Sequence, residues 1–173
     1  KPVLSDSRKA YLTSMQKMIA PVSDLAAILE TLLKNPYRNQ RFDGIIYSDI
    51  HVKKGTVSVY GAGEIFKNLK FGESFAYEGT IAENIEQYKL DYLIIDNTMN
   101  SIKAIDWALF TPHGVRSYYA KPFYERNVLR TILILCSTQA NAFSEDKIKD
   151  YDLLNEPFLQ GLKNWRKACR NNK

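Results

Sequence analysis

Cysteine and histidine are scarce in this sequence, which contains two of each among 173 residues. Cys136 lies in an apolar run and Cys169 in a basic one, so we expect two free thiols in a reducing compartment, the cytoplasm, and no disulfide framework. His51 and His113 are far apart in sequence, and no group of Cys and His has the spacing of metal ligands. The sequence therefore gives no metal signature.

Long apolar runs are also missing. The longest, such as 132–136, are far too short to cross a membrane, so no membrane span is expected in this chain. No signal peptide is recognisable, and the first residue is Lys1 in place of Met. We expect the chain to be part of a longer protein.

Charge is distributed unevenly along the chain. The net charge is +5, and the segment from Lys163 to Lys173 holds five basic side chains and no acid, so the rest of the chain is neutral. A neutral body is not the footprint of a nucleic-acid-binding fold, and we expect no direct nucleic-acid binding. A solvated helical linker is the expected role of residues 156–173. A phosphate-binding or membrane-surface role of this basic segment is the alternative.

Helical periodicity appears at both ends of the chain. Apolar residues recur at helical spacing in 11–19 and 25–33, and Pro21 predicts a kink or break between the two stretches. The second stretch is expected to end near Asn35-Pro36. A last helix is predicted from about residue 145, with an interruption at Pro157.

Strand patterns fill the middle. The sequence predicts strands at 42–50, 56–60 and 91–96, a short helix over 79–88, and a loop at 71–73. Ser101 is expected to cap a further helix whose one side carries Ile102, Ile105, Leu109 and Phe110. The order predicts an α+β domain around a central antiparallel sheet of about five to six strands.

The most strand-like stretch is a hairpin. Gly114-Val115-Arg116-Ser117 opens a run that ends at Pro122-Phe123, and the apolar run 128–136 follows a polar turn at 124–127. Next comes Phe143-Ser144-Glu145-Asp146, in which Ser144 is a candidate N-cap. Tyr118 and Ala120 alternate to one face of the first strand, as Ile132, Ile134 and Cys136 do on the second.

This ordered set of motifs resembles the GAF domain family of small-molecule sensor modules. The resemblance covers residues 40–155, and it departs from the family pattern at 71–78, which is poor in glycine. It implies a ligand pocket on one sheet face, covered by short helices and loops, with the N- and C-terminal helices on the other. The implied domains are a signalling or dimerisation helix at 1–39, a GAF-like sensor domain at 40–155 and a helical linker at 156–173.

The resemblance also implies which side chains line the pocket. The expected ligand-binding residues are Tyr47, Asp96, Asp106, Trp107, Phe110, Tyr118 and Cys136. Each of these residues can also have a purely structural role. Short polar side chains often form hydrogen bonds with the local backbone, and aromatic side chains often fill a hydrophobic core. Asp106 stands where pigment-binding members carry a His, and no Cys is placed for covalent chromophore attachment. The ligand and any cofactor therefore stay undefined.

Three functions are compatible with the sequence. The first is a non-catalytic sensor in a larger signalling protein, which binds an unidentified small molecule and forms a homodimer through its terminal helices. The second is a structural dimerisation module with a vestigial pocket. The third is a small enzyme on the GAF scaffold. This function is the least favoured, because the two cysteines lie far apart in the sequence.

Overall fold

The computed structural model describes residues 5–34 and 42–172. The chain divides into two compact units: a helical unit from the two ends of the chain, and a sheet unit at 42–144. Three expectations lie outside the described residues: the helix end at Asn35-Pro36, the boundary between 39 and 40, and the contribution of Lys173. Within the described ranges, no helix is both long and apolar enough to span a membrane.

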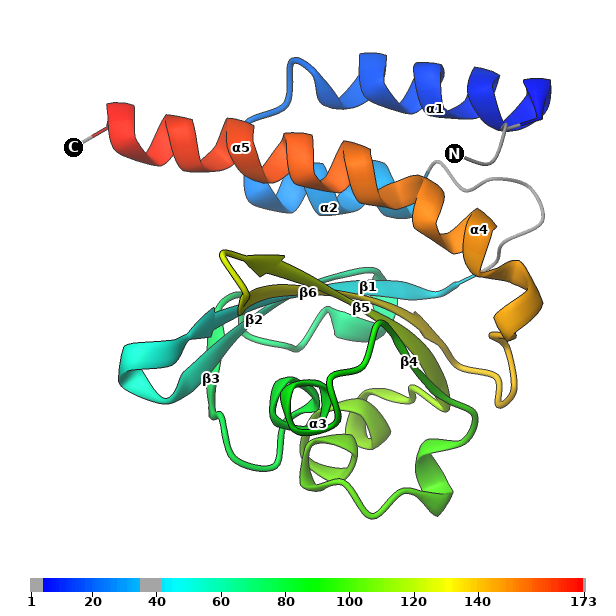
Figure 1. The fold of residues 1–173 in the computed structure, drawn as a ribbon, viewed down its shortest axis with the longest axis vertical. Coiled ribbons are helices and arrows are strands. Elements are labelled where there is room, and N and C mark those ends of the chain that lie inside the picture. The colour runs from blue at the N-terminus through cyan, green and yellow to red at the C-terminus, as the bar shows by residue number, and fades with distance from the viewer. Residues whose placement is uncertain (1–4, 35–41, 173) are drawn as a thin grey trace. The chain divides into compact units, whose positions relative to one another are not determined.

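The helical unit contains α1 (Asp6–Ile19), α2 (Leu25–Lys34), α4 (Ile148–Tyr151) and α5 (Asn155–Asn171) (Figure 1). The chain is non-helical around Pro21, as a residue without a backbone N–H favours. Pro157 lies in the first turn of α5, where a missing N–H costs little. The irregular stretch precedes it, as a 3-10 turn at Asp152–Leu154.

Close packing and polar contacts connect the helices of this unit. A Cβ added to Gly161 of α5 would come within 2.5 Å of Ile28 Cγ2 on α2, so glycine permits this approach. Asn164 Nδ2 donates to the carbonyl oxygens of Ile19 and Val22 at 3.2 and 2.9 Å, where α1 has ended. The Arg8 side chain lies 2.7 Å from Asp150 Oδ1.

The sheet unit is built on one six-stranded sheet in the order β3-β2-β1-β6-β5-β4, and all of its paired strands are antiparallel. The strands are β1 (Gly44–His51), β2 (Thr56–Ala62), β3 (Glu73–Ala76), β4 (Leu93–Ile95), β5 (Ser117–Glu125) and β6 (Val128–Ser137). This α+β architecture confirms the predicted fold class. The expected position of the terminal helices relative to the sheet stays a prediction.

The hairpin predicted from the sequence is β5–β6, in the middle of the chain's sheet. Arg126 and Asn127 form its turn with φ values of 51° and 64°, the two left-handed residues of a type I′ turn. The register sets Tyr118 opposite Cys136 and Ala120 opposite Ile134. These four side chains belong to one buried cluster, which confirms the predicted alternation.

One strand differs from the expectation. The loop predicted at 71–73 is present as a turn at 71–72. The strand β3 that follows it was not predicted; it begins at Glu73 and pairs with β2, with Phe75 opposite Val57. The strand has four residues and pairs on one side only, so the sequence contains too few alternating positions to indicate it.

Helical segments cover one face of the sheet: α3 (Ile81–Tyr88) and a π-helical turn (Asp106–Phe110) (Figure 1). Ile85, Leu109 and Phe110 from these segments join the buried cluster. The prediction that Ile102 shares this buried side was wrong, because Ile102 is 98% exposed. Residues 101–103 are not helical, so helical spacing does not apply there.

Short 3-10 turns make most of the remaining connections. They are Val52–Lys54, Glu64–Phe66, Thr98–Asn100, Thr111–His113, Glu145–Lys147 and Asp152–Leu154.

Candidate functional site

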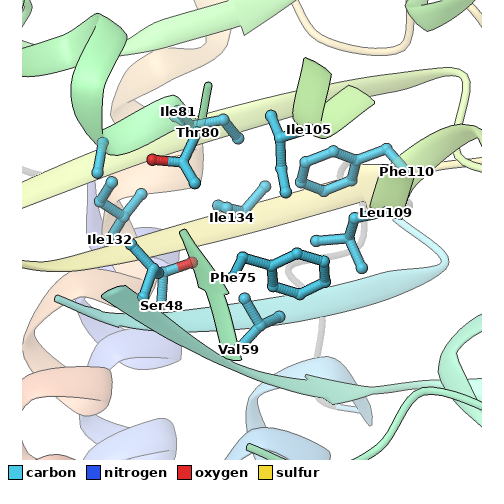
Figure 2. Close-up of a pocket in the computed structure, with 12 residues that line it drawn as sticks. Ser48, Val59, Phe75, Thr80, Ile81, Ile105, Leu109, Phe110, Ile132 and Ile134 are labelled. Atoms are coloured by element: carbon cyan, nitrogen blue, oxygen red, sulfur yellow. The ribbon is translucent and has the colours of Figure 1, made fainter. Parts of the chain in front are cut away.

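A small cavity lies between the sheet and the segments that cover it. Figure 2 shows its lining side chains converging from the sheet, from the start of α3 and from the π-helical turn. The lining residues are Ser48, Val57, Val59, Phe75, Thr80, Ile81, Ala82, Ile105, Leu109, Phe110, Ile132 and Ile134. None is charged, and ten of the twelve side chains carry only carbon and hydrogen.

The empty space at the centre of this cavity is small. It measures about 20 Å³, which is room for about one water molecule. The whole hollow, with its open mouth, measures about 310 Å³. Pockets for drug-sized ligands occupy about 300–1,000 Å³. The central space of about 20 Å³ is therefore far below the volume that a drug-sized ligand occupies.

Two hydroxyl groups interrupt the apolar lining. Thr80 precedes α3, and its Oγ1 donates a 2.6 Å hydrogen bond to the carbonyl oxygen of Tyr77. Ser48 lies on β1, is 6% exposed and points its hydroxyl among the lining side chains (Figure 2). Within residues 5–34 and 42–172, no side-chain partner takes up the hydrogen-bonding capacity of Ser48 Oγ.

A buried carboxyl group holds the π-helical turn that supplies part of the cavity wall. Asp106, the first residue of the turn, is 0% exposed. Its Oδ1 accepts a 2.6 Å hydrogen bond from the Tyr118 hydroxyl, and its Oδ2 accepts one from Ser101 Oγ. The ring of Phe110 stacks on Tyr118 with centroids 4.5 Å apart. The turn is thus attached to β5 by a hydrogen bond and a ring contact.

Burial raises the pKa values of both members of this pair. It raises the pKa of Asp106, although the hydrogen bonds from Ser101 and Tyr118 and the charge of Lys103 act in the opposite direction. Burial also raises the pKa of Tyr118 well above its usual range, with the neighbouring Asp106 adding to the effect. The Tyr118 hydroxyl therefore stays protonated and available as a donor.

The seven residues expected to line a pocket fall into three groups. Phe110 lines the cavity. Asp106, Tyr118 and Cys136 are buried but are not among the residues that line it.

The other three lie elsewhere. Tyr47 alternates with Ile46 and Ser48 on β1, so it occupies the opposite face of the sheet, where its ring stacks on Tyr60 at 5.4 Å. Asp96 is exposed, and Trp107 is 47% exposed with its Nε1 donating to the Ser101 carbonyl at 2.8 Å. A ligand-binding role for the set of seven stays a prediction.

Sequence reasoning missed Ser48, Thr80 and Phe75. Ser48 stands between Ile46 and Ile50 in the period-2 pattern of a strand, and a polar residue among buried positions was the available signal. Phe75 was missed because it lies on β3, a strand that the sequence pattern did not indicate. Thr80 offers no separate signal, since a threonine before a helix is ordinary capping chemistry.

Two larger hollows open on the surface of the sheet unit. One, of about 480 Å³, runs along β4 and is lined by Ile94, Ile95, Asp96, Asn97, Asn100, Ser101, Ile102, Lys103 and Asn141. The other, of about 610 Å³, is lined by Glu86, Lys89, Leu90, Asp91, Tyr124, Asn127 and Leu129. Both are polar and open, so neither shields a small molecule from water as the inner cavity does.

The thiols offer no reactive site in the sheet unit. Cys136 is fully buried, and burial raises the pKa of its thiol well above the usual value, with Asp43 contributing. Cys169 is exposed on α5. In the described part of the chain, no three Cys, His, Asp or Glu side chains are placed to hold a metal ion.

Comparison with known proteins connects this architecture to a fold family. No protein-family model matches the chain, and no curated protein matches its sequence. Solved structures do match. The GAF domain of an Acinetobacter phosphoenolpyruvate-protein phosphotransferase aligns with a TM-score of 0.69 at 12% identity, covering 98% of this chain and 100% of that one.

Two further structures agree. The GAF domain of a two-component sensor histidine kinase from Bacillus halodurans aligns with a TM-score of 0.63 at 13% identity, over 88% of this chain and 100% of that one. Free methionine-R-sulfoxide reductase from Neisseria meningitidis aligns with a TM-score of 0.66 at 12% identity, over 97% of each chain. The chain has the fold of a GAF domain.

Proposed function

We propose that this chain is a non-catalytic, ligand-sensing module of a larger signal-transduction protein. The observation that carries the proposal is the buried apolar cavity between the sheet and the π-helical turn, with the single open hydroxyl of Ser48 inside it. Apolar concavities with few polar groups are the usual form of small-molecule sites. GAF domains of a sensor histidine kinase and of a phosphotransferase share the fold, which supports a sensory regulatory role.

The proposed signal is a shift between two packings of the cavity wall. A ligand that occupies the cavity stabilises the packing that accommodates it, and the population of that packing rises. The lining residues Ile132 and Ile134 belong to β6, which ends at Ser137, and the chain enters its last helical segments at Glu145. The terminal helices are the proposed output, and a homodimer through them is part of the proposal.

The state of the thiols supports a non-catalytic role. A raised pKa keeps the Cys136 thiol protonated at neutral pH, and a protonated thiol is a poor nucleophile. Cys169 belongs to the helical unit, and its sequence neighbours are basic and apolar. An enzyme on this scaffold, like the matched sulfoxide reductase, remains the least favoured candidate. A methionine sulfoxide reductase assay in which Cys136→Ser abolishes turnover would overturn this part.

The central space of about 20 Å³ favours a second candidate, a dimerisation module with a vestigial pocket. In that case the cavity is a packing defect, and no small molecule stabilises the chain.

The exposed Cys169 provides the experiment that separates the two candidates. A thiol-reactive fluorophore should label Cys169 on α5 and leave buried Cys136 unmodified. The labelled chain is screened against a metabolite panel by thermal shift, and each hit is tested for a change in fluorescence. A sensor gives hits that raise the melting temperature and change the probe signal. A panel without hits favours the vestigial pocket, and Cys169→Ser reports the background labelling.

A further inference from the structure

The chemistry of the cavity restricts its ligand to one class. With no charged lining residue, the cavity offers no cationic side chain to pair with a phosphate or a carboxylate. An unpaired charge pays a large desolvation cost in such surroundings. A hydrocarbon frame gains about 25 cal/mol for each Å² of apolar surface buried. The lining therefore favours a neutral ligand that is mostly hydrocarbon.

Ser48 adds one polar requirement. It is 6% exposed, and its hydroxyl points into the cavity (Figure 2). The lining residues Val59 and Ile132 lie opposite Ser48 on the two neighbouring strands. The Thr80 hydroxyl already donates to Tyr77. Ser48 Oγ can both donate to and accept from a ligand. A ligand with a single hydrogen-bonding group directed at Ser48 satisfies the site.

Phe75 is the lining residue whose movement would enlarge the cavity. It lies on β3, an edge strand of four residues that pairs only with β2, and its side chain is half-buried. The π-helical turn, which supplies Leu109 and Phe110 to the lining, is attached to β5 through Asp106 and Tyr118. A ligand larger than one water molecule therefore displaces the Phe75 ring before it displaces Leu109 or Phe110.

We propose that the cavity binds a neutral, hydrocarbon-rich molecule through one hydrogen bond to Ser48 Oγ, with the Phe75 ring turning toward solvent to admit it. The inference rests on the proposed ligand-sensing function and names the chemical class of the ligand.

Three probes that share a benzene ring test this proposal: phenol, toluene and benzoate. Each is titrated into the full 173-residue chain at pH 7, and binding is measured by calorimetry. Phenol should bind about five-fold more tightly than toluene, the ratio expected from one net hydrogen bond. Benzoate, with the same ring and a charge, should not bind. In Ser48→Ala, the preference for phenol should be lost, because the phenol hydroxyl has no partner left, and toluene should bind at least as tightly as it does to the wild type.

Two more variants complete the design. Ser74→Ala, an exposed serine on β3, is the matched control and should keep the five-fold preference of the wild type. Phe75→Ala should gain affinity for 2-naphthol, which is larger than phenol, because the displaced ring no longer competes for the space. Naphthol binding that is unchanged by Phe75→Ala would refute the role of this ring.

The outcomes separate this inference from the proposed function. Benzoate binding equal to that of phenol, an unchanged phenol preference in Ser48→Ala, or no binding of any probe would overturn the ligand class. A charged metabolite that changes the Cys169 probe signal would leave the sensing function standing and refute the class. If phenol and toluene bind with the predicted affinity ratio but the Cys169 probe signal does not change, the ligand class is upheld. The proposed transmission of the signal from the cavity to the terminal helices is then contradicted.

Discussion

The hydroxyl of Tyr118 on β5 donates a 2.6 Å hydrogen bond to Oδ1 of Asp106, and both side chains are fully buried. Asp106 begins the π-helical turn whose Leu109 and Phe110 line the cavity. π-helical turns are rare and often occur at functional sites. This hydrogen bond therefore attaches the π-helical wall of the proposed ligand site to strand β5 of the sheet.

Removing the donor should destabilise the chain. In Tyr118→Phe the ring still stacks on Phe110, yet the buried carboxyl of Asp106 loses a hydrogen bond. We expect the free energy of unfolding to fall by about 1–3 kcal/mol, measured by urea denaturation. Tyr124→Phe, on the same strand and 45% exposed, is the control and should change by less than about 0.5 kcal/mol. Equal effects of the two variants would refute the assigned role of the hydrogen bond.

The pH dependence of stability should contain a contribution from Asp106. Its pKa in the folded chain is raised above the ordinary value of 3.8, so the folded state binds the proton more tightly than the unfolded state. This stabilising contribution is complete below pH 3.8 and is lost as the pH rises through the folded-state pKa.

Comparison with Asp106→Asn isolates that contribution. Lys103, Tyr118 and Cys136 are the titratable groups around the pair, and all three are unchanged in the variant. From pH 4 upward, the wild type should lose stability relative to Asp106→Asn and then reach a constant difference. The readout is urea denaturation at a series of pH values. A difference that does not depend on pH would contradict the assignment.

Much of the sheet unit is predictable from local patterns. The hairpin follows from β-branched and aromatic runs around Arg126-Asn127, and alternation places Tyr118 and Cys136 on one face. The cavity itself is not predictable in this way. It depends on β3, which is too short to indicate a strand, and on a π-helical turn at Asp106–Phe110. The non-helical residues 101–103 precede that turn, so helical spacing misplaces Ile102.

Tyr47 illustrates a second limit. The family resemblance suggested it as a pocket residue, whereas strand register alone assigns it to the face opposite Ser48. Register depends on where a strand starts, and a shift of one residue exchanges the two faces. Sequence patterns locate strands more reliably than they locate the face on which a given side chain lies.

The close approach of α5 to α2 should make Gly161→Ala destabilising. Alanine in place of glycine in a helix interior ordinarily stabilises by about 0.5–1 kcal/mol. Here the new Cβ would lie 2.5 Å from Ile28 Cγ2, and such overpacking costs about 1–3 kcal/mol. Denaturation should therefore show a net loss of stability. Adding Ile28→Ala, which removes the clashing atom, should make the effect of Gly161→Ala smaller, and a stabilising Gly161→Ala single variant would contradict the packing.

The two thiols should react at very different rates. Cys169 is exposed and should react with an excess of a disulfide reagent, whereas Cys136 is buried and the pKa of its thiol is raised. We expect one thiol per chain to react promptly under native conditions and two in denaturant. Cys169→Ser should abolish the prompt reaction. A prompt reaction that persists in this variant would mean that Cys136 is accessible.

Isoleucine methyl groups distinguish the inner cavity from the surface hollow along β4. Ile81, Ile105, Ile132 and Ile134 line the cavity, whereas Ile94, Ile95 and Ile102 line the hollow. The most direct test of the central claim is a phenol titration followed by NMR of the isoleucine methyls. Binding in the cavity shifts the signals of Ile105, Ile132 and Ile134 and leaves that of exposed Ile102 unchanged. Shifts confined to Ile94, Ile95 and Ile102, or no shifts at all, would contradict the claim that the cavity is the ligand site.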